Sequence, residues 1–97
     1  MTIKPSDLSK ALLNKGFRKV SGGDHDYYFY FDEDENKTKI RTKISRGSHG
    51  KKQMGEGMVN IIREQMRFDK KEQLMQFVEC KFTIEDYRSM VNAKNLK

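Results

Sequence analysis

Residues 22–31 have the sequence GGDHDYYFYF, and this stretch decides the fold. A pair of glycines supplies the positive φ angles of a tight turn. A run of tyrosine and phenylalanine favours an extended strand over a helix. The stretch therefore predicts a turn that places His25 at the start of a central strand over residues 25–32. Histidine titrates near neutral pH and can move protons or contact a phosphate, but a lone histidine also commonly just completes a turn.

The alternation of side chains along this strand predicts which face is buried. Tyr27, Phe29 and Phe31 share one face, and Tyr28 and Tyr30 share the other with the carboxylates of Asp26 and Asp32. We expect the phenylalanine face in the core, because hydroxyls and carboxylates are better solvated in water. The same alternation puts His25 on the core side at the start of the strand, unless a turn or bulge redirects it.

Two further strands are expected, over residues 17–20 and 38–45, in a sheet that is antiparallel throughout. The third strand alternates cleanly, with Ile40, Thr42 and Ile44 inward and Lys39, Arg41 and Lys43 outward. The acidic segment 32–36 is expected to be the hairpin connection. It does not match a calcium loop, because Lys37 and Lys43 occupy the positions of the required glycine and glutamate.

Helices are expected on both sides of the strands in the sequence. In the first, Ser6 is the expected N-cap, Leu8, Ala11 and Leu12 form an apolar stripe, and Gly16 ends the helix. A second begins near residues 55–57. Asp69 and Glu72 are expected to cap a third helix, which ends near Glu79. Thr83 and Asp86 are expected to cap a fourth helix.

Length and composition favour one α+β domain over residues 1–97, with an α-β-β-β-α core at about 6–68 and a helical extension at about 69–93. No apolar run reaches the roughly 20 residues of a membrane span, so no membrane partner is expected. Cys80 is the only cysteine, and we expect it to be a small buried side chain in a reducing cytoplasm. The carboxylates lack the spacing of a metal site, and no cofactor is expected.

The net charge of +6 is concentrated in one block. Residues 24–35 contain six acids and no base, whereas residues 37–52 contain seven bases and no acid. Such a block is typical of a surface that binds a polyanion, although lysines also keep strand edges soluble. Residues 45–57 form a glycine-rich loop with a second histidine, which is suited to phosphate. The candidate contacts to such a polyanion are Lys39, Arg41, Lys43, Arg46, His49, Lys51 and Lys52.

Three segments together resemble the HicA family of small ribonuclease toxins from toxin–antitoxin pairs. They are residues 12–17 (LLNKGF), Gly23-Asp24-His25, and the basic strand, loop and helix over residues 43–68. The resemblance implies a double-stranded-RNA-binding-domain-like fold, a catalytic role for His25, a second histidine at His49 and a HicB-like antitoxin partner. The chain departs from the family in Asp24, where serine is usual, in a longer loop at 45–50 and in an added helix at 83–93.

The function we expect is that of a metal-independent endoribonuclease toxin (an mRNA interferase). RNA carries its own nucleophile, the 2′-hydroxyl, so the protein needs a proton carrier, here His25, and cations around the phosphate. Two alternatives remain open. One is a non-catalytic RNA-binding module in which Tyr28 and Tyr30 stack on bases. The other is a protein-interaction subunit whose basic face docks an acidic partner.

Overall fold

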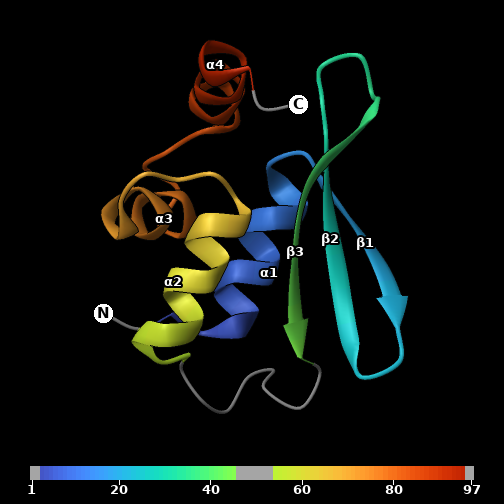
Figure 1. Ribbon diagram of the computed structural model, residues 1–97, viewed down its shortest axis with the longest axis vertical. Coiled ribbons are helices and arrows are strands. Elements are labelled where there is room, and N and C mark those ends of the chain that lie inside the picture. Colours follow the sequence, from blue (N-terminus) through green and yellow to red (C-terminus); the bar gives the residue numbers. More distant parts are fainter. Residues whose placement is uncertain (1–2, 46–53, 96–97) are drawn as a thin grey trace.

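A computed structural model describes residues 3–45 and 54–95 of the chain. The sheet is antiparallel with strand order β1-β2-β3, and the helices lie on one side of it (Figure 1). The α+β class and the three antiparallel strands are therefore confirmed. The elements are α1 (Pro5–Asn14), β1 (Phe17–Gly22), β2 (His25–Phe31), β3 (Lys37–Ser45), α2 (Glu56–Gln65), α3 (Lys71–Val78) and α4 (Ile84–Lys94).

The strand register places matching residues of the three strands in rows. Tyr27 lies between Val20 of β1 and Lys43 of β3, and Phe29 lies between Arg18 and Arg41. Towards the β2–β3 hairpin the ladder is irregular, because residues 38–40 of β3 lie opposite Tyr30 alone. Residues paired across an antiparallel ladder share a face, so each row crosses one face of the sheet.

The expected faces of β2 are wrong. Tyr28 and Tyr30 are fully buried and Asp26 is 4% exposed, whereas Tyr27, Phe29 and Phe31 are only partly buried. The face of β3 is confirmed, since Ile40, Thr42 and Ile44 are buried and the alternating cations Lys39, Arg41 and Lys43 are exposed. The core therefore lies between the tyrosine face of β2 and the helices.

The Tyr28 hydroxyl and the Asp26 carboxylate of the buried face have partners inside the protein, whereas the buried Tyr30 hydroxyl has no hydrogen-bond partner among the described residues. The hydroxyl of Tyr28 hydrogen-bonds Ser9 Oγ of α1 at 2.7 Å, and Asp26 Oδ2 lies 3.7 Å from Lys19 Nζ. Burial, together with the charge of Glu33, raises the pKa of Tyr30, and nearby Arg88 partly offsets this. A hydroxyl with a partner costs little to bury, so the Tyr28 ring can contribute its large apolar area to the core at little cost. Tyr30 contributes its ring area against the cost of an unpaired hydroxyl.

Aromatic side chains from the C-terminal helices complete this core. The ring of Tyr30 packs 5.4 Å from Phe17 and 5.0 Å from Tyr87 of α4. Phe77 of α3 lies 5.7 Å from Tyr87. Tyr87 donates a hydrogen bond from its hydroxyl to the carbonyl of Met66 at 2.8 Å, and burial raises its pKa. The rings meet at tilted or edge-on angles, which aromatic pairs prefer.

The ends of the helices differ from expectation in two places. Helix α1 begins at Pro5 with Lys4 as its N-cap, so Ser6 is not the cap; proline fits the first helical turn. Before α3, the side-chain oxygen of Gln73 accepts the backbone N–H groups of residues 69 and 70, so the Asp69–Glu72 cap is wrong. The cap of α4 is confirmed: Thr83 Oγ1 accepts from Asp86 N at 3.2 Å, and Asp86 Oδ2 accepts from Thr83 N at 3.0 Å.

Cys80 was expected in the core, and this is also wrong. The chain leaves α3 at Cys80 through a left-handed conformation with φ of 65°, and the side chain is exposed. The apolar residues of α3 that are buried in the core are Leu74 and Phe77, which lie six and three residues before Cys80. Among the described residues, none of the helices is long and apolar enough to cross a membrane.

The two faces of β2 should differ in their sensitivity to truncation. We expect Tyr30→Ala to lower the free energy of unfolding by about 3–5 kcal/mol, because it removes a ring from a closed aromatic cluster. Phe29→Ala, on the partly exposed face, should cost about 1 kcal/mol. Denaturant titration of both variants measures the difference, and equal losses would contradict the assignment of the faces.

Gly16, between α1 and β1, is expected to be intolerant of alanine. Its φ is 89°, and an added Cβ would lie 3.2 Å from Ile84 Cδ1. A left-handed conformation alone costs an L-residue about 1–2 kcal/mol, so Gly16→Ala should lower the unfolding free energy by at least that amount. Gly57 of α2 is the matched control, because its Cβ would contact nothing within 4 Å. Gly57→Ala should stabilise the protein by about 0.4–1 kcal/mol, and a similar result for Gly16→Ala would refute the argument.

Candidate functional site

The side of the sheet that faces away from the helices combines cations with aromatic rings. We call it the open face. Its members follow from the strand register and from the side chains that are not buried. They are Arg18 and Val20 of β1, His25, Tyr27, Phe29 and Phe31 of β2, and Lys37, Lys39, Arg41 and Lys43 of β3.

His25 lies on the open face without any bulge at its own position. Its backbone pairs with Gly22 on one side and Ser45 on the other, and the preceding turn contains Gly23 with φ of 59°. Because Tyr28 and Tyr30 point inward, strict alternation puts His25 outward with Tyr27. The two rings are 6.4 Å apart, and His25 is partly buried. The predicted glycine turn is thus confirmed, and the expectation that alternation would bury His25 is wrong.

Two of the aromatic rings on the open face are in cation–π contact with a basic side chain. Lys37 Nζ lies 4.0 Å from the centre of the Phe29 ring, and Arg18 Cζ lies 4.1 Å from that of Phe31. Arg18 also lies 3.4 Å from the carboxylate of Glu35. Cation–π contacts of this kind hold long side chains against the sheet while the charge stays accessible.

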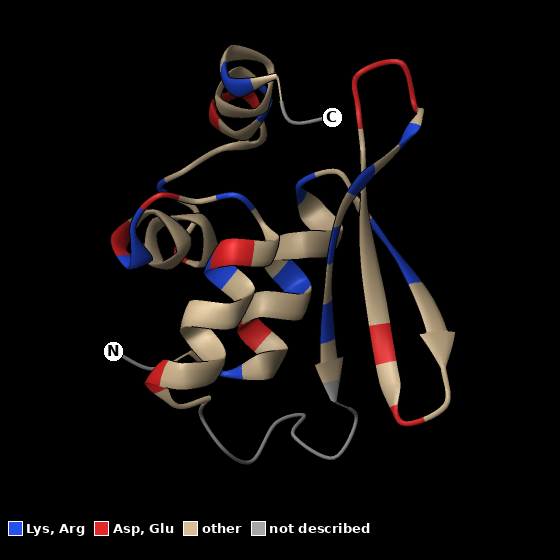
Figure 2. Ribbon diagram, in the orientation of Figure 1, with Lys and Arg blue, Asp and Glu red and all other residues tan. Residues whose placement is uncertain are grey.

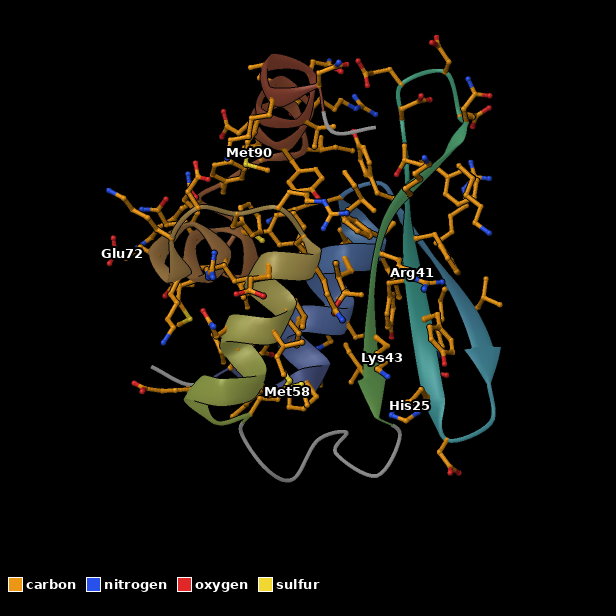
Figure 3. The ribbon with its side chains drawn as sticks, in the orientation of Figure 1. His25, Arg41, Lys43, Met58, Glu72 and Met90 are labelled. Atoms are coloured by element: carbon orange, nitrogen blue, oxygen red, sulfur yellow. The ribbon has the colours of Figure 1, made fainter. Side chains whose placement is uncertain are left out.

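Two cavities meet beside Lys43. One, of about 420 Å³, is lined by Tyr27, Phe29 and Arg41. The other, of about 440 Å³, is lined by His25 and by Met58 and Ile61 of α2. Lys43 and Gln65 border both cavities. Figure 3 shows Lys43 and His25 near the end of β3 and Met58 near the start of α2.

The structure brings the predicted strand cations together with His25. Lys39, Arg41 and Lys43 are exposed on the open face, and Lys43 is the diagonal neighbour of His25 across the β2–β3 ladder. Diagonal neighbours lie about 7–8 Å apart at the backbone, which is within reach of a long side chain. The other predicted contacts, Arg46, His49, Lys51 and Lys52, lie outside the described residues.

The sequence reasoning missed other members of this site. Tyr27 and Phe29 were assigned to the core, because the tyrosine hydroxyls of the other face were expected to need water. Arg18 and Lys37 are visible in the sequence as strand cations, but only the register puts them on the open face. Gln65 has no sequence signal. It reaches the edge of β3 from α2, where its side-chain oxygen accepts a hydrogen bond from Thr42 Oγ1 at 2.7 Å.

The acidic hairpin is separated from His25 by the length of β2. Figure 2 shows its red loop at one end of the sheet and the cations along β3. Asp32 Oδ1 accepts the backbone N–H groups of Asp34 and Asn36, at 3.0 and 2.9 Å, and Asn92 of α4 donates to Glu33 at 3.0 Å. Asp32 and Glu33 therefore order the hairpin at the end of β2 that is distant from His25, whereas Asp24 and Asp26 flank His25 in the sequence.

Within residues 3–45 and 54–95, no three His, Cys, Asp or Glu side chains are grouped as metal ligands would be. Comparison of the chain with models of known protein families, with curated proteins and with solved structures found no match. The open face combines a histidine, a row of cations and partly buried aromatic rings. Those groups suit a phosphodiester that carries bases.

Proposed function

We propose that this protein binds RNA on the open face of its sheet and cleaves it without a metal ion, with His25 as general acid or base. The observation that carries the proposal is the position of Lys43, which borders both the cavity of His25 and the cavity of Tyr27. A phosphate held by Lys43 would have a proton carrier on one side and an aromatic ring on the other.

Binding would come from the cations and from the rings. Lys39, Arg41 and Lys43 project from alternate positions of one strand, so their charges follow a line along the sheet. A nucleic-acid backbone is a line of phosphates, and each neutralised phosphate releases counterions. The rings of Tyr27 and Phe29 add surfaces on which bases of any sequence can stack.

Cleavage would use the 2′-hydroxyl of RNA as the nucleophile. A bond forms between O2′ and phosphorus, the bond from phosphorus to O5′ breaks, and the products are a 2′,3′-cyclic phosphate and a 5′-hydroxyl. One proton leaves O2′ and another is taken up by O5′. His25 would transfer one of them, and Lys43 would stabilise the charge that accumulates on the phosphate oxygens.

The wider role we propose is that of a toxin in a toxin–antitoxin pair, acting in the cytoplasm with an antitoxin protein as partner. It rests on the resemblance of three sequence segments to the HicA family. The element order α-β-β-β-α, with the helices on one side of the sheet, is compatible with the double-stranded-RNA-binding-domain-like fold that the resemblance implies. Growth arrest on expression in a bacterial host is the direct test of this role.

The second candidate is a non-catalytic RNA-binding module with the same face. The exposed rings favour it, because stacking and charge are sufficient for binding. The stacking residues would be Tyr27 and Phe29, since Tyr28 and Tyr30 are buried. A protein that binds RNA but leaves it intact, even at high enzyme concentration, would support this candidate over the nuclease.

The salt dependence of RNA affinity should report on the three strand cations. Changing Lys39, Arg41 and Lys43 together to Gln should reduce the slope of log affinity against log salt by about two units, at about 0.7 per phosphate contact on single strands. Lys10, Lys70 and Lys81 are three exposed lysines outside the open face, and changing them to Gln removes the same charge. An equal effect of the two triple variants would show that only net charge matters.

Removal of His25 should separate chemistry from binding. We expect His25→Ala to reduce RNA cleavage by about 10²–10⁴-fold with RNA affinity and unfolding midpoint unchanged, because the cations supply the affinity. Wild-type cleavage should persist in EDTA and leave a cyclic phosphate. An oligonucleotide with 2′-deoxyribose at the cut site should bind but stay intact. Cleavage of the deoxy substrate, or full activity of His25→Ala, would overturn the mechanism.

A further inference from the structure

Tyr27 has a position on the open face that depends on a glycine beside it. A Cβ built on Gly22 would lie 3.3 Å from Tyr27 Cε2 and 3.6 Å from Cδ2. The Tyr27 ring therefore extends across the end of β1 into space that a larger residue at 22 would occupy. Val20, the partner of Tyr27 in the ladder, is 53% exposed and borders the same cavity.

The other two rings of β2 on this face are already in contact with cations. Lys37 lies over Phe29 and Arg18 lies over Phe31. Among the described residues, no cation is stacked on Tyr27. Tyr27 is thus the aromatic side chain of β2 on which a planar ligand can stack without first displacing a lysine or an arginine.

The cavity at Tyr27 combines the features of a nucleotide subsite. Its volume is about 420 Å³, and it is bordered by two aromatic rings, by Val20 and by the cationic side chains of Arg41 and Lys43. Pockets of about 300–1,000 Å³ accommodate small ligands. A flat apolar base and a charged phosphate match the two halves of this lining.

The stacking of bases in a duplex favours an unpaired RNA chain as the ligand. Both faces of an interior base in a duplex are covered by neighbouring bases, so that base cannot stack on a protein ring unless it leaves the helix. An unpaired strand can place one base on Tyr27 while its backbone follows the cations of β3.

We propose that Tyr27 is a base-stacking subsite that selects unpaired RNA, with the adjoining phosphate on Lys43 and the scissile bond next to His25. This deepens the proposed function and rests on it. The subsite makes RNA in a duplex a poor ligand, because the base has to leave its stack before it can reach the ring.

The test uses a short 2′-O-methyl RNA oligonucleotide, which cannot be cleaved, as a single strand and as a duplex with its complement. We expect the full-length protein to bind the single strand more tightly. Tyr27→Ala should weaken single-strand binding by about 5- to 150-fold, the effect of losing one stacked base, with little change for the duplex. Tyr27→Phe retains the ring and should bind as the wild type does. Ser21→Ala, at an exposed position of β1 that borders neither cavity, is the control for general disturbance of the sheet.

Tyr27→Leu provides a second variant with apolar bulk but no aromatic ring, and it should show the same loss as Tyr27→Ala. Equal binding of single strand and duplex by the wild type would overturn the subsite. Wild-type affinity of Tyr27→Leu for the single strand would also overturn the subsite. If the Lys39, Arg41 and Lys43 triple variant loses affinity in the same experiment, the proposed RNA-binding function is still supported. Failure of the wild type to bind either form would overturn both proposals.

Discussion

The aromatic cluster around Tyr30 is the constraint on which the rest of the structure depends. Phe17, Tyr87 and Phe77 pack with Tyr30 in a network of rings 5.0 to 6.3 Å apart, and this requires the side chain of Tyr30 to point towards the helices. Side chains of a strand alternate strictly, so one inward residue assigns every other residue of β2 to a face. His25 is therefore outward because Tyr30 is inward.

The helices after the sheet take part in this constraint. The ring of Tyr87 of α4 packs on Tyr30, and that of Phe77 of α3 packs on Tyr87. Lys15 at the end of α1 is buried with its ammonium 4.5 Å from the Phe77 ring. Lys15 also donates a hydrogen bond to the Phe77 carbonyl at the end of α3. A cation at that end complements the helix dipole. The C-terminal helices thus determine which face of β2 is left uncovered, although they lie on the opposite side of the sheet.

The strand register also places a cation of β3 next to His25. Lys43 lies opposite Tyr27 and diagonal to His25, so one cation serves both positions. Asp32 and Glu33 of the hairpin are held at the other end of β2 by their hydrogen bonds to the hairpin backbone and to Asn92. These two acids are thereby kept away from His25. The carboxylates next to His25 in the sequence are those of Asp24 and Asp26, and Asp26 Oδ2 lies 3.7 Å from Lys19 Nζ.

The sequence by itself determined the features that depend on local chemistry. A glycine turn before His25, the alternation of isoleucine and cations along β3, and the Thr83–Asp86 cap all follow from residues close in the chain. The buried face of β2 was decided only by the tertiary structure, because both faces are aromatic and the choice depends on partners such as Ser9 and Tyr87, which are distant in sequence. Gln65 joined the site for the same reason. Local sequence patterns indicate the chemical properties of each side chain, but the packing of elements that are distant in sequence determines which side chains lie close together.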